Sequence, residues 1–293
     1  MEITAKTKLH PVIGKPMGQS LSSRMGNIIY ELMGEDCYRF PIEIEREDLG
    51  PVLDGLRRMN TVCIGITKPY KVEVIPYLDE VDDLALKIGA VNSIQVVNKK
   101  LIGRNLDGLA FLHGLQTEIN EKLEDTTFFC FGAGGAGKAI CCTLAYYGAK
   151  RILITDKFDE CAGLLTADIN AKFAPVAEQV LYEDREKVQS LFQESDVVLN
   201  VSGVGMAPHL GESPAEAEWF QPRQVAFDAI YNPAKTQFLM DAEAAGCRIF
   251  NGKKMLIGCS MLGFRERFEN CPDYEVWSQA FDQAQAANRI PNP

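Results

Sequence analysis

Short apolar runs alternate along the chain with stretches of helical periodicity. The apolar runs predict strands at 9–13, 38–44, 62–66, 90–97, 127–131, 151–155, 197–201, 225–229 and 248–250. The periodic stretches predict helices at 24–33, 46–59, 71–78, 136–147, 161–170 and 236–245. Gly34, Gly148 and Gly246 follow three of these helices, where a C-cap glycine would lie. Strands that alternate with helices predict parallel sheets with crossover helices, and therefore an α/β fold.

Two segments depart from the alternation. Residues 93–97 and 101–104 flank the polar turn 98–100, which predicts a hairpin. After residue 250 the pattern is helical to about residue 287, and we expect this tail to pack back on the first domain. The length of 293 residues itself predicts about two domains.

Composition and charge narrow the class of protein. Forty acidic and thirty basic residues give a net charge of −10, which disfavours nucleic acid and anionic lipid as partners. The nine cysteines are odd in number and form no C-x-x-C pair, so they favour a reducing cytoplasm over a disulfide framework. Residues 1–10 hold no apolar signal core, and Lys138 with several glycines interrupts the apolar segment 128–149. We therefore expect a cytoplasmic protein without a membrane span.

The segment 128–139, FFCFGAGGAGKA, carries the strongest chemical signal. It joins a predicted strand to a predicted helix through Gly132, Gly134 and Gly137 in the pattern G-x-G-x-x-G. The first glycine permits a tight turn, the second lets backbone approach a pyrophosphate, and the third lets the helix pack on its strand. The helix N-terminus then offers free N–H groups to phosphates. A tight strand–helix turn alone would use the same glycines, but the flanking elements favour a dinucleotide site.

The residue that ends the next strand bears on the choice of cofactor. Asp156 lies 19 positions after Gly137, about where a carboxylate would accept hydrogen bonds from a ribose 2′-hydroxyl. This carboxylate predicts a preference for NAD over NADP, which Lys157 would partly offset. The alternative is that Asp156 only caps a helix or a turn.

A nicotinamide enzyme also needs a group that accepts a proton beside the reacting carbon. The three histidines of the chain have settings typical of structural residues. Lys71 ends the segment GITKPYK, which follows a strand, and Asp107 lies in GRNLDG just before a predicted helix. Both would lie at the carboxyl edge of a sheet, where open α/β sheets bind ligands. On these residues alone, a solvated lysine and a helix cap explain the pattern equally well.

The ordered motifs together resemble the shikimate/quinate dehydrogenase family over nearly the whole chain. The matching segments are IGKP with S-L-S at 13–22, TKPYK at 67–71, GAVNS at 89–93, N-L-D-G at 105–108, GAGGA at 132–136, residues 200–206, D-A-I-Y-N-P with Thr236 at 228–236, and Gly252 with Met255-Leu256. The resemblance implies that Lys71 relays the proton of a ring hydroxyl while hydride leaves for the nicotinamide. It implies that Asp107 holds Lys71 and shares that hydroxyl.

The remaining site residues also follow from the resemblance. Ser20 and Ser22 would bind the substrate carboxylate with neutral hydroxyls, without a buried arginine. The residues that would complete the substrate wall are Thr67, Asn92, Tyr231 and Cys259. The residues that would contact the cofactor are Gly132, Ala133, Gly134, Gly135, Ala136, Asp156, Lys157, Ala229 and Gly252. The motifs also imply a substrate-binding α/β domain of residues 1–108 with 256–293, and a Rossmann-type doubly wound domain of residues 109–255.

Five positions depart from the family pattern. Gly65 replaces an Asn, Leu106 a Thr, Cys259 a Gln and Gly26 a His, and beside Gly26 the usual Pro of the same loop is Ser23. Each lost contact to a buried hydroxyl would cost about 1–3 kcal/mol. Whether Cys259 contacts substrate or only packs stays open. Because Lys71 and Asp107 are both present, these changes indicate an altered substrate preference more than a dead enzyme.

We therefore expect an NAD-linked oxidoreductase that interconverts the ring hydroxyl of shikimate or quinate and the 3-dehydro ketone. One alternative keeps the reaction on a different cyclic hydroxy acid, such as an amino-substituted one. Another is a non-catalytic nucleotide or metabolite sensor, because a fold does not fix a function. We expect no metal, no nucleic acid and no membrane partner, and either a monomer or a homodimer.

Overall fold

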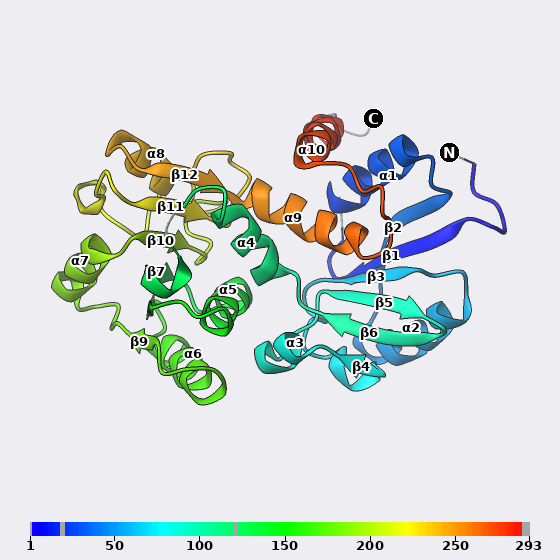
Figure 1. Ribbon diagram of the computed structural model, residues 1–293, viewed down its shortest axis with the longest axis horizontal. Helices are drawn as coiled ribbons and strands as arrows, with labels where there is room; N and C mark the ends of the chain where they lie inside the picture. Colours follow the sequence, from blue (N-terminus) through cyan, green and yellow to red (C-terminus); the bar gives the residue numbers. More distant parts are fainter. Residues whose placement is uncertain (1, 18–20, 120–121, 289–293) are drawn as a thin grey trace. The chain divides into compact units, whose positions relative to one another are not determined.

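The computed structural model describes residues 2–17, 21–119 and 122–288 (Figure 1). They form two compact units, one of Met1–Leu106 with Ile257–Pro293 and the other of Asp107–Leu256. Within the described residues each unit holds one sheet of six strands. The predicted α/β class is confirmed.

The first unit is built on a mixed sheet in the order β2-β1-β3-β5-β6-β4. Its strands are β1 (Lys8–Gly14), β2 (Cys37–Glu43), β3 (Cys63–Ile66), β4 (Glu80–Val81), β5 (Ser93–Val97) and β6 (Lys100–Arg104). β1 is parallel to β2 and β3, whereas β5 is antiparallel to β3 and β6. The predicted hairpin is therefore present. Its turn has two residues, Asn98 and Lys99 at φ of 51° and 65°, because Val97 pairs with Lys100.

Segments from both ends of the chain cover one face of this sheet. The helices of the first unit are α1 (Leu21–Met33), α2 (Leu49–Arg58), α3 (Asp83–Ile88), the end of α9 (Gly252–Arg265) and α10 (Tyr274–Asn288). In Figure 1 the red α10 lies beside the blue α1. Phe264 of α9 stacks on Tyr30 of α1 with ring centroids 4.5 Å apart, and it meets Trp277 of α10 edge to face at 4.8 Å. These rings join the C-terminal helices to the first sheet.

The second unit has a fully parallel sheet in the order β12-β11-β10-β7-β8-β9. Its strands are β7 (Thr127–Phe131), β8 (Arg151–Thr155), β9 (Ala177–Gln179), β10 (Val197–Asn200), β11 (Val225–Asp228) and β12 (Arg248–Asn251). The helices along this part of the chain are α4 (Asp107–Leu115), α5 (Gly135–Tyr146), α6 (Asp159–Lys172), α7 (Arg185–Glu194) and α8 (Gln237–Ala244). This strand order is that of a Rossmann-type fold, and its direction of winding changes between β7 and β10.

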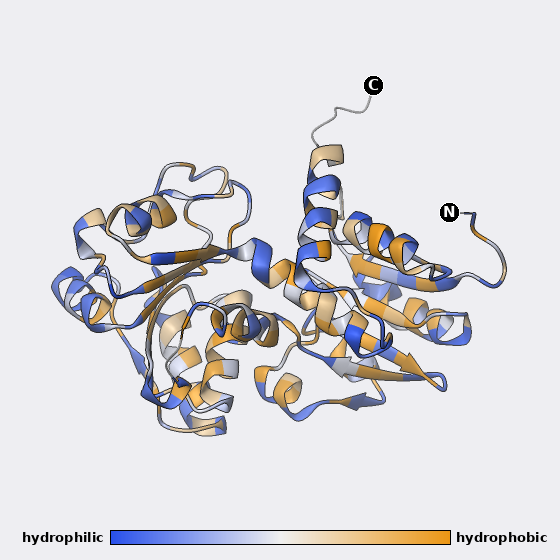
Figure 2. Ribbon diagram, turned by 45° about the horizontal axis from the view of Figure 1, so that its top comes forward, coloured by the Kyte–Doolittle hydropathy of each residue, from blue (hydrophilic) through white to orange (hydrophobic). Residues whose placement is uncertain are grey.

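Buried apolar strands form the core of each unit. Phe129, Phe131 and Phe192 pack in the second unit with ring centroids 5.0–5.9 Å apart. In the first unit, Ile13 and Ile64 of neighbouring strands are fully buried. Figure 2 accordingly shows mostly hydrophobic strands, whereas the helices carry hydrophilic colours on their outer faces. Each fully buried large apolar side chain contributes about 1.5–3 kcal/mol to folding.

The helix predicted for residues 71–78 is wrong. Residues 68–74 form turns, and only the 3₁₀ turn Ile75–Tyr77 follows them. Pro76 lacks the N–H that a continuing helix would need, and the β-branched Val72, Val74 and Ile75 lower helix propensity further. Lys71 therefore lies on an irregular segment and not on a helix.

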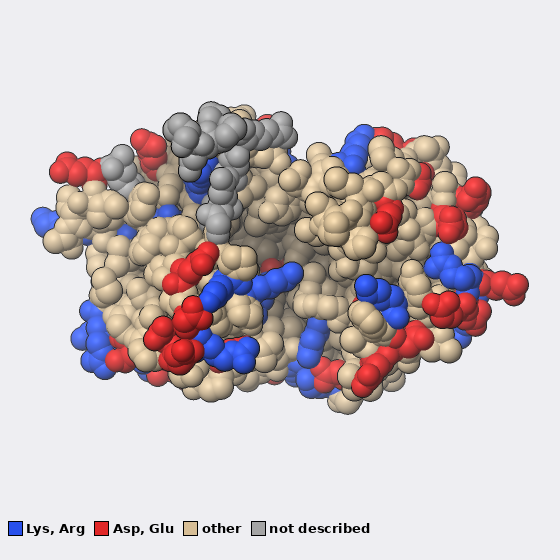
Figure 3. Space-filling view, turned by 180° about the vertical axis from the view of Figure 1, so that it is seen from behind, with Lys and Arg blue, Asp and Glu red and all other residues tan. Residues whose placement is uncertain are grey.

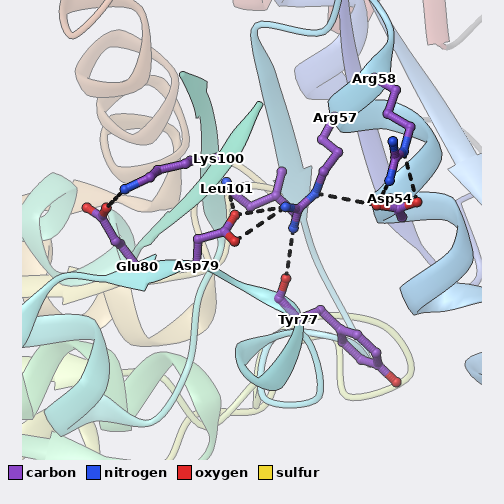
Figure 4. A network of polar contacts seen from close by, with 8 residues as sticks. All are labelled: Asp54, Arg57, Arg58, Tyr77, Asp79, Glu80, Lys100 and Leu101. Atoms are coloured by element: carbon purple, nitrogen blue, oxygen red, sulfur yellow. Dashed lines mark hydrogen bonds and ion pairs between the residues drawn. The ribbon is translucent and has the colours of Figure 1, made fainter. Parts of the chain in front are cut away.

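A network of ion pairs anchors the far end of the segment that carries Lys71 (Figure 4). Arg57 of α2 pairs with Asp79 at 3.0 Å and donates to the Tyr77 carbonyl at 3.4 Å. Asp79 accepts a 2.7 Å hydrogen bond from the Leu101 N–H of β6. This bond and then Arg57 lower the pKa of Asp79. The turn after Lys71 is thus tied both to α2 and to the sheet.

Charges of both signs lie close together on the surface. On the face drawn in Figure 3, acidic and basic side chains are interspersed. A membrane span would need a long apolar helix, and the described part of the chain contains none that meets this requirement.

Candidate active site

Backbone hydrogen bonds bring three predicted site residues to one edge of the first sheet. The Thr67 N–H donates to the Ile13 carbonyl of β1 at 2.9 Å, which places Thr67 just beyond the end of β3. The Val91 N–H donates to the Lys71 carbonyl at 2.7 Å, and the Ile66 N–H donates to the Asn92 carbonyl at 2.9 Å. Thr67, Lys71 and Asn92 are all half-buried, so each has a side chain within reach of solvent.

Asn92 also fixes the segment that follows β6. Its Oδ1 accepts a 2.8 Å hydrogen bond from the Leu106 N–H. The Sγ of Cys259 on α9 lies 3.5 Å from the Leu106 carbonyl oxygen. Two of the positions that depart from the family pattern, Leu106 and Cys259, are therefore in contact with each other. The thiol of Cys259 packs against backbone here.

The other substrate residues are placed less fully. Ser20 lies outside the described residues, and Ser22 is a half-buried residue of the first turn of α1. Tyr231 belongs to the second unit, where burial raises the pKa of its phenol.

The two predicted catalytic residues belong to different units. Lys71 lies in the first unit, whereas the half-buried Asp107 begins α4 of the second. Asp107 follows Leu106 directly along the chain, and Leu106 is bonded to Asn92. The pairing of Lys71 with Asp107 stays a prediction.

A cavity of about 260 Å³ lies at the carboxyl ends of β7, β8 and β10 in the second unit. Its lining includes Gly132, Gly134, Asp156, Lys157, Tyr182 and Ser202. The position is the switch point of the sheet, where doubly wound folds bind nucleotides. Sequence reasoning named four of these six as cofactor residues. Ser202 lies in the matching segment 200–206 but was given no role there, and no motif marks Tyr182.

The glycines around this cavity have distinct backbone roles. Gly132 has a φ of 109°, and a Cβ there would lie 2.7 Å from the Ser202 N. A Cβ on Gly137 would overlap the Gly132 carbonyl oxygen, so the glycine is required for α5 to pack on β7. A Cβ on Gly134 or Gly135 would meet no atom within 4 Å. The N-terminus of α5, which includes Ala136, therefore faces open space in which a pyrophosphate would fit.

Both carboxylate oxygens of Asp156 accept hydrogen bonds from backbone N–H groups. Its Oδ2 accepts a 2.8 Å hydrogen bond from the Ala133 N–H, and its Oδ1 accepts one of 2.9 Å from the Phe158 N–H. The carboxylate thus ties the glycine-rich turn to the turn after β8. A turn-capping role for Asp156 was the alternative to ribose binding that the sequence left open, and these contacts are those of a turn cap.

The neighbouring Lys157 is exposed. Its Nζ lies 5.0 Å from the centroid of the Phe158 ring, and it forms no ion pair within the described residues. The ammonium group therefore stays available beside the cavity that Lys157 lines.

Ala229 and Gly252 lie together in the second unit. The Ala229 N–H donates to the Asn200 carbonyl at 2.9 Å, and the Gly252 N–H donates to the Ile230 carbonyl at 3.2 Å. A Cβ on Gly252 would overlap the Ala229 carbonyl oxygen, so close backbone packing alone requires this glycine. A role for either residue in nicotinamide binding stays a prediction.

A buried carboxylate organises the loops that follow β10 and β11. Asp228 accepts hydrogen bonds from Asn200 at 2.8 Å, from Thr236 at 2.6 Å and from the Ile230 N–H at 2.9 Å. Burial raises the pKa of Asp228 to about 6, and these three donors oppose that rise. The sequence motif contained Asp228 and Thr236, but only the fold shows that they meet Asn200.

We expect Asp228 to make stability fall as pH rises. The pKa of Asp228 in the folded protein is about 6, above the usual 3.8. Its contribution to the free energy of unfolding is therefore full below about pH 4 and is lost as pH rises through 6. The difference in unfolding free energy between wild type and Asp228→Asn should shrink by about 2–3 kcal/mol from pH 4 to pH 7. Urea titrations at each pH measure it. A difference that does not change with pH would contradict the shift.

Metal ligands are a separate question. Across residues 2–17, 21–119 and 122–288, no three His, Cys, Asp or Glu side chains gather as ligands of one ion.

A chain that holds both a Rossmann-type unit with a glycine-rich turn and an α/β unit with a lysine at its sheet edge is typical of the dinucleotide-dependent oxidoreductases. Comparisons with known proteins give the family. Residues 12–94 match the family model described as the shikimate dehydrogenase substrate binding domain. The chain is 35% identical over 272 residues to the shikimate dehydrogenase (NADP(+)) of Bacillus cytotoxicus, covering 93% of this chain and 96% of that one.

Two solved structures are similar over nearly their full length. Shikimate 5-dehydrogenase from Listeria monocytogenes, in complex with shikimate and NAD, is 29% identical with a TM-score of 0.87 and covers 98% of each chain. Quinate dehydrogenase from Corynebacterium glutamicum, in complex with NAD, is 26% identical with a TM-score of 0.87 and covers 94% of this chain and 99% of that one. This chain belongs to the shikimate dehydrogenase family, whose members are oxidoreductases that act on CH–OH groups.

The predicted preference for NAD over NADP is wrong. Curated relatives at 34–35% identity, from Bacillus cytotoxicus and Bacillus cereus, are shikimate dehydrogenases (NADP(+)). The physical reason lies in Asp156, whose two oxygens accept backbone N–H groups. Both oxygens of the carboxylate that was expected to bind the ribose 2′-hydroxyl are thereby engaged within the protein, and the cation Lys157 follows it in the chain.

Proposed function

We propose that this protein oxidises the ring hydroxyl of shikimate or quinate to the 3-dehydro ketone, reversibly, with NADP as cofactor. The observation that carries the proposal is the meeting of Thr67, Lys71 and Asn92 at one sheet edge in a chain of this family. The 35% sequence identity to a shikimate dehydrogenase over most of the chain supports the same reaction on the same class of ring acid.

Each residue has a role that its chemistry allows. Lys71 holds the proton of the reacting hydroxyl at its Nζ, and a carboxylate at Asp107 orients that ammonium. Thr67 and Asn92 hydrogen-bond the remaining ring hydroxyls, and Ser22 binds the carboxylate. NADP, when bound, accepts the hydride at its nicotinamide ring. The residues that hold it are those around the glycine-rich turn, and the N–H groups at the start of α5 bind its pyrophosphate.

Lys157 is the residue that we expect to recognise the 2′-phosphate of NADP. An exposed ammonium beside the cavity attracts the dianionic 2′-phosphate of NADP, whereas NAD has a neutral hydroxyl at that position. Lys157→Ala should weaken NADP binding about tenfold and leave NAD binding within twofold, since charge-assisted hydrogen bonds contribute about 1.5–3 kcal/mol. Isothermal titration calorimetry with both nucleotides measures this. Equal losses for the two nucleotides would remove Lys157 from phosphate recognition.

A different ring acid is the second candidate substrate. The packing of Cys259 on the Leu106 carbonyl favours it, because that site offers no amide to read a ring hydroxyl. Steady-state NADPH formation with shikimate, quinate and amino-substituted ring acids distinguishes the candidates. No turnover of any ring acid, despite measurable NADP binding, would contradict a dehydrogenase and favour a non-catalytic sensor. The cytoplasmic location and the oligomeric state stay predictions.

A further inference from the structure

Two arginines and a histidine lie on the face of the first sheet that α1 and α9 cover. Arg39 of β2 pairs in register with His10 of β1, so both side chains point to the same face. His10 contacts Tyr30 of α1, with 2.8 Å between its Nδ1 and the Tyr30 hydroxyl oxygen. Arg267, which follows α9, has its Nη2 2.6 Å from the Sγ of Cys63 on β3. All of these residues belong to the first unit.

Arg39 is a half-buried residue with few polar contacts. Its Nη1 lies 3.5 Å from the Ser260 Oγ of α9, at the limit of a hydrogen bond. Its Nε is buried and has no hydrogen-bond partner among the described residues. The same is true of two guanidinium nitrogens of Arg267, Nε and Nη1. Unpaired buried donors of this kind are costly, so they point to a missing acceptor.

The charges of this group are not balanced by a carboxylate. In the part of the chain that the structure describes, neither Arg39 nor Arg267 forms an ion pair. The nearby Glu266 already pairs with Arg104 and accepts from Gln95. Burial lowers the pKa of Arg39; Tyr30 and Cys63 oppose that shift, and the positive charge of Arg267 adds to it. Burial and then these two arginines also hold the pKa of His10 well below its usual value, so His10 is neutral and does not add to the charge.

The side chain of Arg39 lies against α1, the helix that carries the proposed substrate residue Ser22. A Cβ on Gly26 would lie 2.8 Å from the Arg39 Cδ and 3.4 Å from its Nη1, so glycine at 26 makes room for the arginine. Gly26 is four residues after Ser22 on α1, and residues at that spacing share one helix face. On the other side, Ser260 directly follows Cys259, which contacts Leu106.

We propose that Arg39 is a specificity-determining residue that binds the carboxylate of the ring acid together with Ser22. This inference rests on the proposed function. The incoming carboxylate supplies both the acceptor that the Arg39 guanidinium lacks and the negative charge that this face of the sheet lacks. In place of neutral serines alone, the carboxylate then meets a charged group, for which Gly26 leaves room.

The direct test compares an acid with its neutral ester. Wild type, Arg39→Met and Arg39→Lys are assayed with shikimate and with shikimate methyl ester at saturating NADP. Wild type should prefer the acid by about 10–100-fold in kcat/KM, the range expected for a charged hydrogen-bonded contact. Arg39→Met should lose most of that preference through KM, with kcat nearly unchanged, and Arg39→Lys should keep part of it. An acid-to-ester ratio that is the same in wild type and Arg39→Met would overturn the proposal.

Two controls separate recognition from folding. Arg57→Met removes another enclosed arginine of the same unit, whose partners are Asp79 and Tyr77 (Figure 4). It should lower the melting temperature and leave the acid-to-ester ratio unchanged. Arg39→Met should melt no lower than wild type, because it removes an unpaired buried charge. If Arg39→Met instead fails to fold, Gly26→Ala, which crowds the arginine, should still lower the ratio, and an unchanged ratio there would overturn the proposal.

A binding measurement keeps this inference separable from the proposed function. If wild type turns over neither shikimate nor quinate, the proposed function is wrong, and thermal shifts with benzoate and benzamide then decide the role of Arg39. Benzoate should raise the melting temperature of wild type and not that of Arg39→Met, whereas benzamide should affect neither. Equal shifts for both proteins, or no shift of wild type with benzoate, would overturn the arginine site.

Discussion

Lys71→Ala lowers kcat with shikimate by about 10²–10⁴-fold, the range that a positioned proton-transfer group contributes. Its NADP dissociation constant stays within about twofold of the wild-type value, because the nucleotide cavity lies in the second unit and Lys71 in the first. Steady-state kinetics and calorimetry measure the two quantities separately. The large loss in kcat reflects the removal of the amine that takes the proton of the reacting hydroxyl as hydride leaves.

Lys68 provides a matched control on the same segment. It is exposed and three residues before Lys71, and its carbonyl accepts from the Lys15 N–H at 2.9 Å whatever its side chain is. Lys68→Ala should therefore leave kcat within about twofold of wild type. Comparable losses for Lys68→Ala and Lys71→Ala would show that the segment, and not the Lys71 ammonium, limits turnover.

Gly137→Ala should weaken NADP binding by more than about tenfold and cost about 1–3 kcal/mol of unfolding free energy. The added Cβ would overlap the Gly132 carbonyl oxygen, so the N-terminus of α5 must move away from β7. The N–H groups that hold the pyrophosphate would move with it. Fluorescence titration with NADPH and urea unfolding measure the two effects.

Gly135→Ala separates packing from phosphate approach. A Cβ on Gly135 meets no protein atom within 4 Å, so unfolding free energy should stay within about 0.5 kcal/mol of wild type. Any loss of NADP affinity in this variant then arises at the phosphate itself. If Gly137→Ala bound NADP as wild type does, the close packing of α5 on β7 would not determine the cofactor site.

Elements whose signal is local were predictable from the sequence. Thr127–Phe131 and Arg151–Thr155 are strands with the expected bounds, because both are short runs with apolar centres beside clear turn residues. The positive φ of Gly34, Gly148 and Gly246 likewise agrees with their predicted place after helices. The glycine-rich turn belongs to the same group, since its backbone demands are set within a few residues.

Elements that depend on distant partners were not predictable in the same way. The periodicity of residues 71–78 resembles a helix, but Pro76 and the β-branched residues beside it leave only turns. The two-residue strand β4 exists only because β6 pairs with it.

Helix α3, by contrast, has a local sequence signal that was not used to predict it. Asp82 caps its first turn by accepting from the Ala85 N–H at 2.6 Å, and Gly89 follows its end at a φ of 72°.

The site shows the same division. Spacing placed Asp156 near a cofactor, but spacing does not say which donors a carboxylate meets, and here they are the N–H groups of Ala133 and Phe158. Arg39 carried no signal at all. An arginine in a strand is typical of an exposed position, and it is enclosed here only because α9, more than two hundred residues later in the chain, covers that face.

The closure of the first sheet by α9 and α10 has a consequence for synthesis on the ribosome. The second unit is continuous in sequence and can fold as soon as Leu256 has emerged. The first unit cannot, because the rings that cover its sheet, Phe264 and Trp277, are among the last residues made. The nascent chain thus completes its Rossmann-type unit while Tyr30 of α1 and Arg39 of β2 are still uncovered. A chain that stops short of Ile257 would keep a folded Rossmann-type unit and leave the other half open to proteolysis and aggregation.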